Sequence, residues 1–205
     1  MSKTPTTQHS SQVLQAYNQA GAAYNKDRKN LGSSRYLQRF LQLLPAESTV
    51  LDVGCGNGLP IALELIRRGH LVTGLDFSPA QITLAQKNCP RGEFLLRDIS
   101  TLQPGEFSVD AVVCMYTLFH LPRITHGAFL RTLSSFLPVG GILLISLGET
   151  DFEGEHDFYG QRMWSSQYGP SKNRELLAAA GFEIVVDEID RSNNEEHQIV
   201  IAQKK

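Results

Sequence analysis

The residues with the clearest chemical character form a short glycine-rich stretch that begins with an acid. Its sequence is Asp52-Val53-Gly54-Cys55-Gly56-Asn57-Gly58, and it follows the apolar pair Val50-Leu51. Pro60 and apolar residues at helical spacing come next, so the pattern predicts a strand, a tight turn and a helix. Glycines allow a sharp bend and a close approach of a ligand to the main chain. The N–H groups at the helix start favour a carboxylate or a phosphate, which predicts a ligand with an anionic group here.

Two acids at the ends of predicted strands narrow the choice of ligand. Asp52 lies two residues before Gly54, where a carboxylate suits an ammonium group better than a pyrophosphate. Asp76 ends a second predicted strand, 22 residues after Gly54, at the spacing that brings a carboxylate to ribose hydroxyls. The third glycine of a dinucleotide fingerprint would stand where the chain has Leu59, which disfavours a nicotinamide-dependent oxidoreductase. An amino-acid end and a ribose end together indicate S-adenosylmethionine (SAM).

On these motifs the chain resembles the class I, Rossmann-like, SAM-dependent methyltransferases, with residues 52–58 as the first motif. The resemblance spans roughly residues 13–203 and implies methyl transfer, with S-adenosylhomocysteine as the product. It also implies that Asp98 accepts a hydrogen bond from the adenine amine, that carbonyls near Met115 hold the methionine ammonium and that Tyr24 closes over the cofactor. The implied cofactor contacts are Tyr24, Asp52, Gly54, Cys55, Gly56, Asn57, Gly58, Asp76, Phe77, Asp98, Ile99, Met115 and Tyr116. An alternative of another class is a SAM-binding protein without catalysis, which would act as a sensor or partner subunit.

Predicted strands alternate with predicted helices along the chain, which indicates an α/β fold. We expect a doubly wound, mostly parallel seven-stranded sheet with an antiparallel last strand and helices on both faces. Residues 1–12 are expected to form a disordered polar lead, and residues 13–205 a single domain. Within that domain, residues 13–44 are predicted to form two cap helices, which either cover a sheet edge or bring Tyr17 and Tyr24 over the cofactor. Residues 149–170 show no clear periodicity and are predicted to form an irregular insertion that serves as the acceptor lid.

His120 is the candidate general base, because it follows the fourth predicted strand and imidazole titrates near neutral pH. The alternative is a structural histidine that packs or bonds to the backbone. The other histidines considered are His156, in the insertion, and His126, expected on a helix surface. The residues expected to contact the acceptor are Tyr17, His120, Tyr159, Trp164 and Tyr168. For Tyr17 and Trp164, a packing role in the core is the alternative.

Composition restricts the partners. The formal net charge is −2 and no long run of Lys or Arg occurs, which argues against nucleic acid. No apolar stretch has the length of a membrane span, and the N-terminus lacks the apolar segment of a signal peptide. The three cysteines have no regular spacing, so we expect neither a disulfide framework nor a metal site. Composition therefore predicts a cytoplasmic location. Together with the methyltransferase resemblance, it leads us to expect a monomer or homodimer that methylates an O or N atom of a small molecule.

Overall fold

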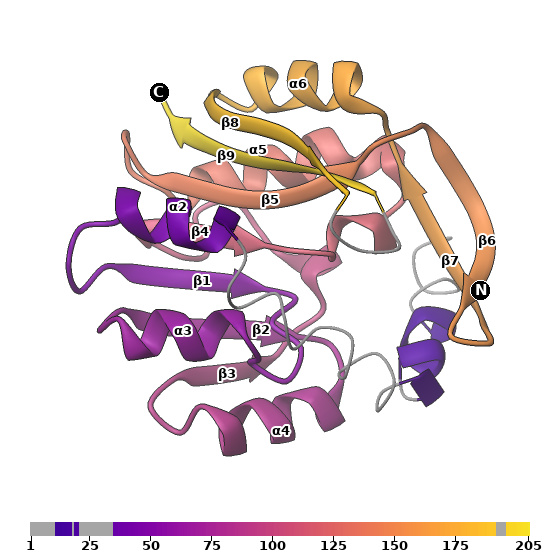
Figure 1. Ribbon diagram of the computed structural model, residues 1–205, viewed down its shortest axis with the longest axis horizontal. Coiled ribbons are helices and arrows are strands. Elements are labelled where there is room, and N and C mark those ends of the chain that lie inside the picture. Colours follow the sequence, from indigo (N-terminus) through magenta and orange to yellow (C-terminus); the bar gives the residue numbers. More distant parts are fainter. Residues whose placement is uncertain (1–10, 18, 21–34, 192–195) are drawn as a thin grey trace.

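The computed structural model describes residues 11–17, 19–20, 35–191 and 196–205. Its centre is a seven-stranded sheet in the order β3-β2-β1-β4-β5-β9-β8 (Figure 1). The parallel strands are β1 (Thr49–Val53), β2 (Leu71–Asp76), β3 (Glu93–Leu96), β4 (Ala111–Cys114) and β5 (Ile142–Gly148). The last strand, β9 (His197–Lys204), lies antiparallel between β5 and β8 (Phe182–Asp190). The predicted fold class is confirmed, including the antiparallel last strand.

Helices cover both faces of this sheet. The larger helices are α2 (Arg35–Leu43), α3 (Ile61–Arg67), α4 (Pro79–Asn88), α5 (His126–Ser135) and α6 (Pro170–Ala179). The apolar side chains of α2, α3 and α4 share one core cluster with one face of the sheet. Those of α5 and α6 share a second cluster with the opposite face. Burial of both faces explains why β4 and β5 are buried along their full lengths.

The order of the strands creates a switch point beside β1. The chain runs from β1 outward through β2 to β3, and then returns to place β4 on the other side of β1. Ligands of open α/β sheets bind at the carboxyl ends of the strands near such a point. Three short 3₁₀ turns lie near this edge: η2 (Ile99–Thr101), η3 (Leu118–His120) and η4 (Arg123–Thr125).

A β-hairpin leaves the main body after β5. Its strands are β6 (Phe152–Phe158) and β7 (Gln161–Gln167), paired antiparallel in a sheet of their own. The turn residues Tyr159 and Gly160 both have positive φ, at 52° and 76°, as a type I′ hairpin turn requires. The expectation of an irregular backbone over residues 149–170 is therefore wrong, and the acceptor-lid role of this segment stays a prediction. Regular pairing was hidden because β6 alternates little and exposes most of its side chains.

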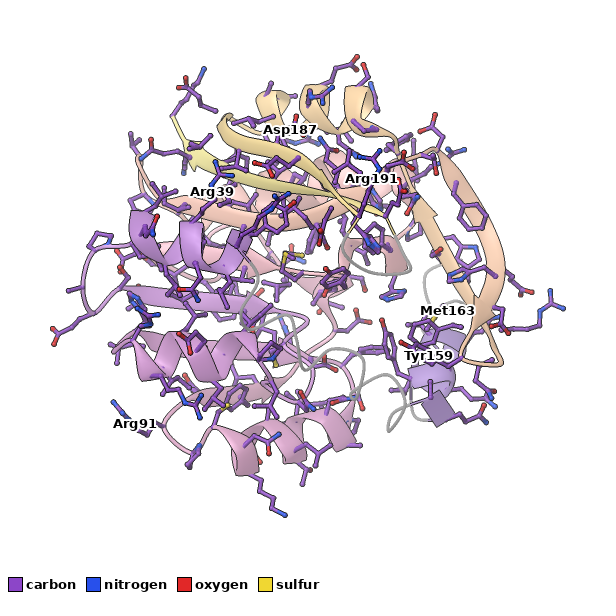
Figure 2. All side chains as sticks on the ribbon, viewed as in Figure 1. Arg39, Arg91, Tyr159, Met163, Asp187 and Arg191 are labelled. Atoms are coloured by element: carbon purple, nitrogen blue, oxygen red, sulfur yellow. The ribbon has the colours of Figure 1, made fainter. Side chains whose placement is uncertain are left out.

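The N-terminal helix (residues 11–17 and 19–20) packs against this hairpin. Its apolar side chains share a cluster with Phe158 and Met163. Figure 2 shows Tyr159 and Met163 at the end of the hairpin that meets this helix. The expectation that both cap helices cover a sheet edge is wrong, since α2 covers a sheet face against β5 and β9. Ser11 and Gln12, expected in the disordered lead, are helical.

Candidate functional site

A cleft opens at the carboxyl ends of β1, β2 and β4, and it encloses about 110 Å³. Its walls come from the glycine turn, the ends of three strands, the start of α4, the η3 turn and the N-terminal helix. The lining residues are Val13, Tyr17, Asp52, Gly54, Cys55, Gly56, Asn57, Leu59, Pro60, Ile61, Asp76, Phe77, Ser78, Gln81, Asp98, Ile99, Met115, Tyr116, Thr117, His120 and Leu121. Segments separated by up to about a hundred residues thus meet at the edge that the strand order predicts.

Two glycines of the turn, Gly54 and Gly56, differ in what surrounds them. Gly54 has φ +78°, and a Cβ there would lie 2.0 Å from Oγ1 of Thr117, so no larger residue fits. Gly56 has φ +54°, and a Cβ there would meet no atom within 4 Å. The main chain at Gly56 therefore borders open space in the cleft, where a ligand can approach it.

Asp76 links the turn to the second strand. One carboxylate oxygen accepts a hydrogen bond from the Gly56 N–H at 2.9 Å, and the other accepts from the Ser78 N–H at 2.9 Å. Burial raises the pKa of Asp76, and these backbone hydrogen bonds oppose that rise. Each carboxylate oxygen has a second lone pair, so Asp76 can hold the turn and still accept from a ligand hydroxyl.

Asp52 places a second carboxyl group in the same cleft. It is 3% exposed, and burial followed by repulsion from Asp76 raises its pKa to about 7. A buried carboxyl group with a raised pKa in a cleft is typical of a binding or catalytic site. A cation bound beside Asp52 would favour its charged form.

The opposite end of the cleft follows strand β4. Tyr116 has φ 57°, and its N–H donates to Oγ of Ser146 at 2.5 Å. His120 ends the η3 turn, and its Nε2 lies 2.8 Å from the Tyr17 hydroxyl. The two rings also meet edge to face, with centroids 5.3 Å apart. This end of the cleft therefore combines aromatic surface, a hydroxyl group and an imidazole.

Most of the residues expected from the sequence lie together in this cleft. Those that line it are Tyr17, Asp52, Gly54, Cys55, Gly56, Asn57, Asp76, Phe77, Asp98, Ile99, Met115, Tyr116 and His120. Gly58 lies in the turn but is not part of the lining, and Tyr24 falls outside the described residues.

The three hairpin residues expected at the acceptor do not line the cleft. Tyr159 is exposed at the hairpin turn, and Trp164 is buried in β7, 6% exposed. Tyr168 packs edge-on against His126, and the Arg123 guanidinium lies over its ring. This placement favours the packing alternative for Trp164.

His126 does not lie on a helix surface as expected. It is 2% exposed, and its Nε2 lies 3.0 Å from the Leu121 carbonyl oxygen. Burial lowers the pKa of His126 to about 4. His126 is the first residue of α5, directly after the short η4 turn, so the helical spacing along α5 alone did not indicate its burial.

Sequence reasoning missed several lining residues. No contact with a ligand was expected for Val13, Leu59, Pro60, Ile61, Ser78, Gln81, Thr117 and Leu121. Gln81 is the most informative of them, because its Oε1 is buried and has no hydrogen-bond partner among the described residues. A buried acceptor without a partner, beside a cleft, suits a ligand donor. Its position three residues after the N-cap Ser78 was the available signal.

Comparison with known proteins agrees with the fold and the first motif. Residues 50–141 match a family model described as a methyltransferase domain. The chain is 36% identical over 112 residues to a ubiquinone biosynthesis O-methyltransferase of Xanthomonas axonopodis pv. citri, covering 51% of this chain and 45% of that protein. It is 33% identical over 148 residues to a trans-aconitate 2-methyltransferase of Escherichia coli O157:H7, covering 71% and 57%. The chain thus spans about half the length of the curated relatives it matches.

A solved structure resembles the whole chain. The 1,6-didemethyltoxoflavin-N1-methyltransferase of Burkholderia thailandensis, crystallised with 1,6-didemethyltoxoflavin and S-adenosylhomocysteine, has a TM-score of 0.72. The match is 22% identical and covers 100% of this chain and 92% of that one, so it supports the fold. The family model over residues 50–141, the relatives and the sheet order agree with the glycine turn between Asp52 and Asp76, and together they support a class I, Rossmann-like, SAM-dependent methyltransferase.

Proposed function

We propose that the chain is an enzyme that transfers the methyl group of SAM to an O or N atom of a small-molecule acceptor. The observation that carries this proposal is the meeting of Asp52, Asp76 and the glycine turn in one cleft. SAM carries a sulfonium, an ammonium, a carboxylate and ribose hydroxyls. The carboxyl groups of the cleft can attract the cationic groups of SAM and accept hydrogen bonds from its hydroxyls. The exposed main chain of the glycine turn allows the ligand to approach closely.

The charges and the hydrogen-bonding groups of the cleft fit this cofactor. The charged side chains among the described lining residues are Asp52, Asp76 and Asp98, with no Lys or Arg. A ligand with net positive charge therefore matches the site. The buried Gln81 Oε1 can accept a hydrogen bond from the ribose or adenine part. The family resemblance assigns the adenine amine to Asp98 and the methionine ammonium to the carbonyls near Met115.

The residues of the chain then bind, orient and exclude water. SAM, when bound, supplies an electrophilic methyl group on a positively charged sulfur. Asp76 accepts from the ribose hydroxyls while its backbone hydrogen bonds fix its carboxylate. Asp52 contributes negative charge near the methionine end. The lining aromatics Tyr17, Phe77 and Tyr116 surround the remaining space and limit the entry of water.

His120 is proposed as the base for an acceptor that enters with a proton on the reacting atom. Its imidazole lines the cleft beyond the end of β4, where an acceptor would meet the methyl group. The acceptor proton would pass to the imidazole as the acceptor atom is methylated. The alternative is a structural role, in which His120 only hydrogen-bonds to the Tyr17 hydroxyl. Substitution of His120 distinguishes the catalytic role from the structural one.

The charges of the cleft also favour one class of acceptor. The three aspartates are assigned to the cofactor, and no Lys or Arg occurs among the described lining residues to pair with the carboxylates of a polycarboxylate such as trans-aconitate. Binding such an anion without a cationic partner costs free energy, so we expect an acceptor without anionic groups, such as a neutral hydroxylated or amino-substituted ring. A direct test compares methylation of trans-aconitate with that of catechol at equal concentrations. Faster methylation of trans-aconitate would contradict this choice.

The alternative is a SAM-binding protein without catalysis. The test is to follow formation of S-adenosylhomocysteine by mass spectrometry while neutral phenols and amines are offered as acceptors. Formation above the rate with SAM alone supports an enzyme. Tight SAM binding without turnover on any acceptor supports the sensor or partner-subunit alternative.

The remaining expectations stay predictions: a cytoplasmic location, no nucleic-acid partner and a monomer or homodimer. In the part of the chain that the structure describes, no helix has the length and apolar character to cross a bilayer.

A further inference from the structure

We propose that Tyr17 is a positioning residue that fixes the imidazole of His120 for proton transfer, an inference that rests on the proposed base role of His120. The Tyr17 hydroxyl lies 2.8 Å from Nε2 of His120, although 103 residues separate the two in the sequence. Both side chains line the cleft. The contact therefore joins the N-terminal helix directly to the acceptor end of the site.

The hydroxyl group of Tyr17 is not needed for packing, and it is the part of the side chain that contacts His120. The Tyr17 ring meets Phe158 edge to face at 5.3 Å, and Phe158 belongs to the apolar cluster of helix and hairpin. A phenylalanine would satisfy that cluster equally well. Only the hydroxyl reaches the polar imidazole, so the tyrosine adds an oriented hydrogen bond to an apolar contact.

The main chain of His120 is held by a contact of its own, separate from those of the ring. His120 ends the short η3 turn, where its N–H donates to the Thr117 carbonyl oxygen at 3.1 Å. That hydrogen bond fixes the main chain but not the two side-chain torsions. The Tyr17 hydroxyl and the perpendicular ring contact, at 88°, restrict both the ring orientation and the proton placement.

The hydrogen bond between Tyr17 and His120 can form with both the neutral and the protonated imidazole. In the neutral imidazole that can act as the base, Nε2–H donates to the Tyr17 oxygen, so the acceptor proton goes to Nδ1. Once His120 has taken the acceptor proton, both ring nitrogens carry hydrogen, and Nε2–H donates to the Tyr17 oxygen. Tyr17 thus stabilises the charged product of proton transfer without changing its own protonation state.

The position of Tyr17 depends on how the N-terminal helix docks. Val13, Ala16 and Ala20 on this helix are buried in a cluster with Phe158 and Met163 of the hairpin. Gln12 Nε2 also donates to Glu155 of β6 at 3.1 Å. The hairpin therefore acts on the site through the helix that it holds, although its own predicted aromatics do not line the cleft.

The test is a mutant cycle of Tyr17→Phe, His120→Asn and the double variant, with Tyr36→Phe as the matched control. Tyr36 is a buried tyrosine on α2 whose hydroxyl accepts from Arg35, so its substitution removes an equivalent hydroxyl elsewhere. We expect Tyr17→Phe to lower kcat about tenfold, the size of one lost hydrogen bond, with SAM affinity and melting temperature close to wild type. Tyr36→Phe should retain wild-type kcat.

The double variant distinguishes positioning from independent packing. If Tyr17 acts through His120, the double variant should turn over no more slowly than His120→Asn alone. The ¹⁵N signals of the His120 imidazole, assigned by their loss in His120→Asn, should shift in Tyr17→Phe and not in Tyr36→Phe. Unchanged kcat, losses that multiply in the double variant or unchanged imidazole signals would each overturn the inference. Failure of the proposed function looks different, since the wild-type protein would then form no S-adenosylhomocysteine.

Discussion

Two carboxyl groups with unequal surroundings dominate the site at the scale of single residues. Asp76 is held by the N–H groups of Gly56 and Ser78, whereas burial and the neighbouring Asp76 raise the pKa of Asp52 to about 7. From this difference we infer different tasks: in the proposed site, Asp76 would accept from ribose hydroxyls, and Asp52 would respond to the charge of the ligand.

Asp76→Asn should weaken SAM binding and remove one of the two backbone hydrogen bonds at the turn, because the amide NH2 group cannot accept from the N–H of Gly56 or Ser78 that it faces. The lost negative charge should cost about 1.5–3 kcal/mol of SAM binding, roughly ten- to a hundredfold. Calorimetry on the folded variant measures this change. Glu93→Ala, at the exposed start of β3, is the matched control and should bind SAM normally. Wild-type SAM affinity in Asp76→Asn would remove Asp76 from the ribose site.

Asp52 should make both SAM affinity and stability depend on pH. A bound cation favours the carboxylate, so SAM affinity should rise between pH 6 and pH 8, near the folded pKa of about 7. The pKa of Asp52 is higher in the folded than in the unfolded chain. Its contribution to stability is therefore greatest at low pH and is lost as pH rises from about 4 to about 7.

The matched variant for this prediction is Asp52→Asn, which mimics the neutral acid. Its melting temperature relative to wild type, without ligand, should be higher at pH 8 than at pH 5. Its SAM affinity should change less with pH than that of the wild type. Parallel pH profiles of the two proteins, for melting and for binding, would show that Asp52 does not titrate in this range.

His120→Asn should separate chemistry from binding. If His120 is the base, turnover should fall by about 10²–10⁴, because asparagine cannot accept the acceptor proton. SAM affinity should barely change, since His120 lies at the acceptor end of the cleft. Steady-state kinetics together with SAM calorimetry decide the matter. Wild-type turnover would return His120 to a structural role.

At the scale of elements, the sequence was most informative where local pattern and tertiary role agree. Runs of β-branched and apolar residues indicate the buried strands β4 and β5. The glycines between Gly54 and Gly58 indicate the tight turn that follows β1. Asp52 and Asp76 could be placed together because their parallel strands pair directly, with Asp52 opposite Gly74. Ser78 caps α4 through the Gln81 N–H, as its spacing predicts.

The hairpin and the N-terminal helix could not be placed in this way. A tyrosine with positive φ begins the turn at Tyr159, where hairpins favour Asn or Gly. The exposed strand β6 shows no alternation between buried and exposed residues. The contact between Tyr17 and His120 depends on the docking of two elements that are distant in sequence, so no local pattern could reveal it.

Trp164→Ala tests how the hairpin is built. Trp164 is buried in β7, near the η3 turn that β7 contacts. Removal of a buried tryptophan should lower the free energy of unfolding by about 3–5 kcal/mol. Denaturant unfolding measures this loss, and Phe152→Ala, on the exposed side of β6, should cost far less. Near-normal stability combined with lost acceptor binding would instead place Trp164 in an acceptor pocket.

At the scale of the whole molecule, the chain is almost neutral, but several carboxyl groups lie together in one cleft. The formal net charge is −2 over 205 residues, yet three carboxyl groups line the cleft beside the switch point of the sheet. The two core clusters hold the strand ends rigidly from both faces. The N-terminal helix and the hairpin pack together outside the sheet, beyond the ends of its strands (Figure 1).

The most direct test of the central claim is a calorimetric titration of the wild-type protein with SAM, with NAD as the comparison ligand. The account predicts saturable SAM binding at a single site per chain, affinity that rises from pH 6 to pH 8 and no binding of NAD. Absence of SAM binding at millimolar concentration, or binding of NAD in its place, would contradict the account.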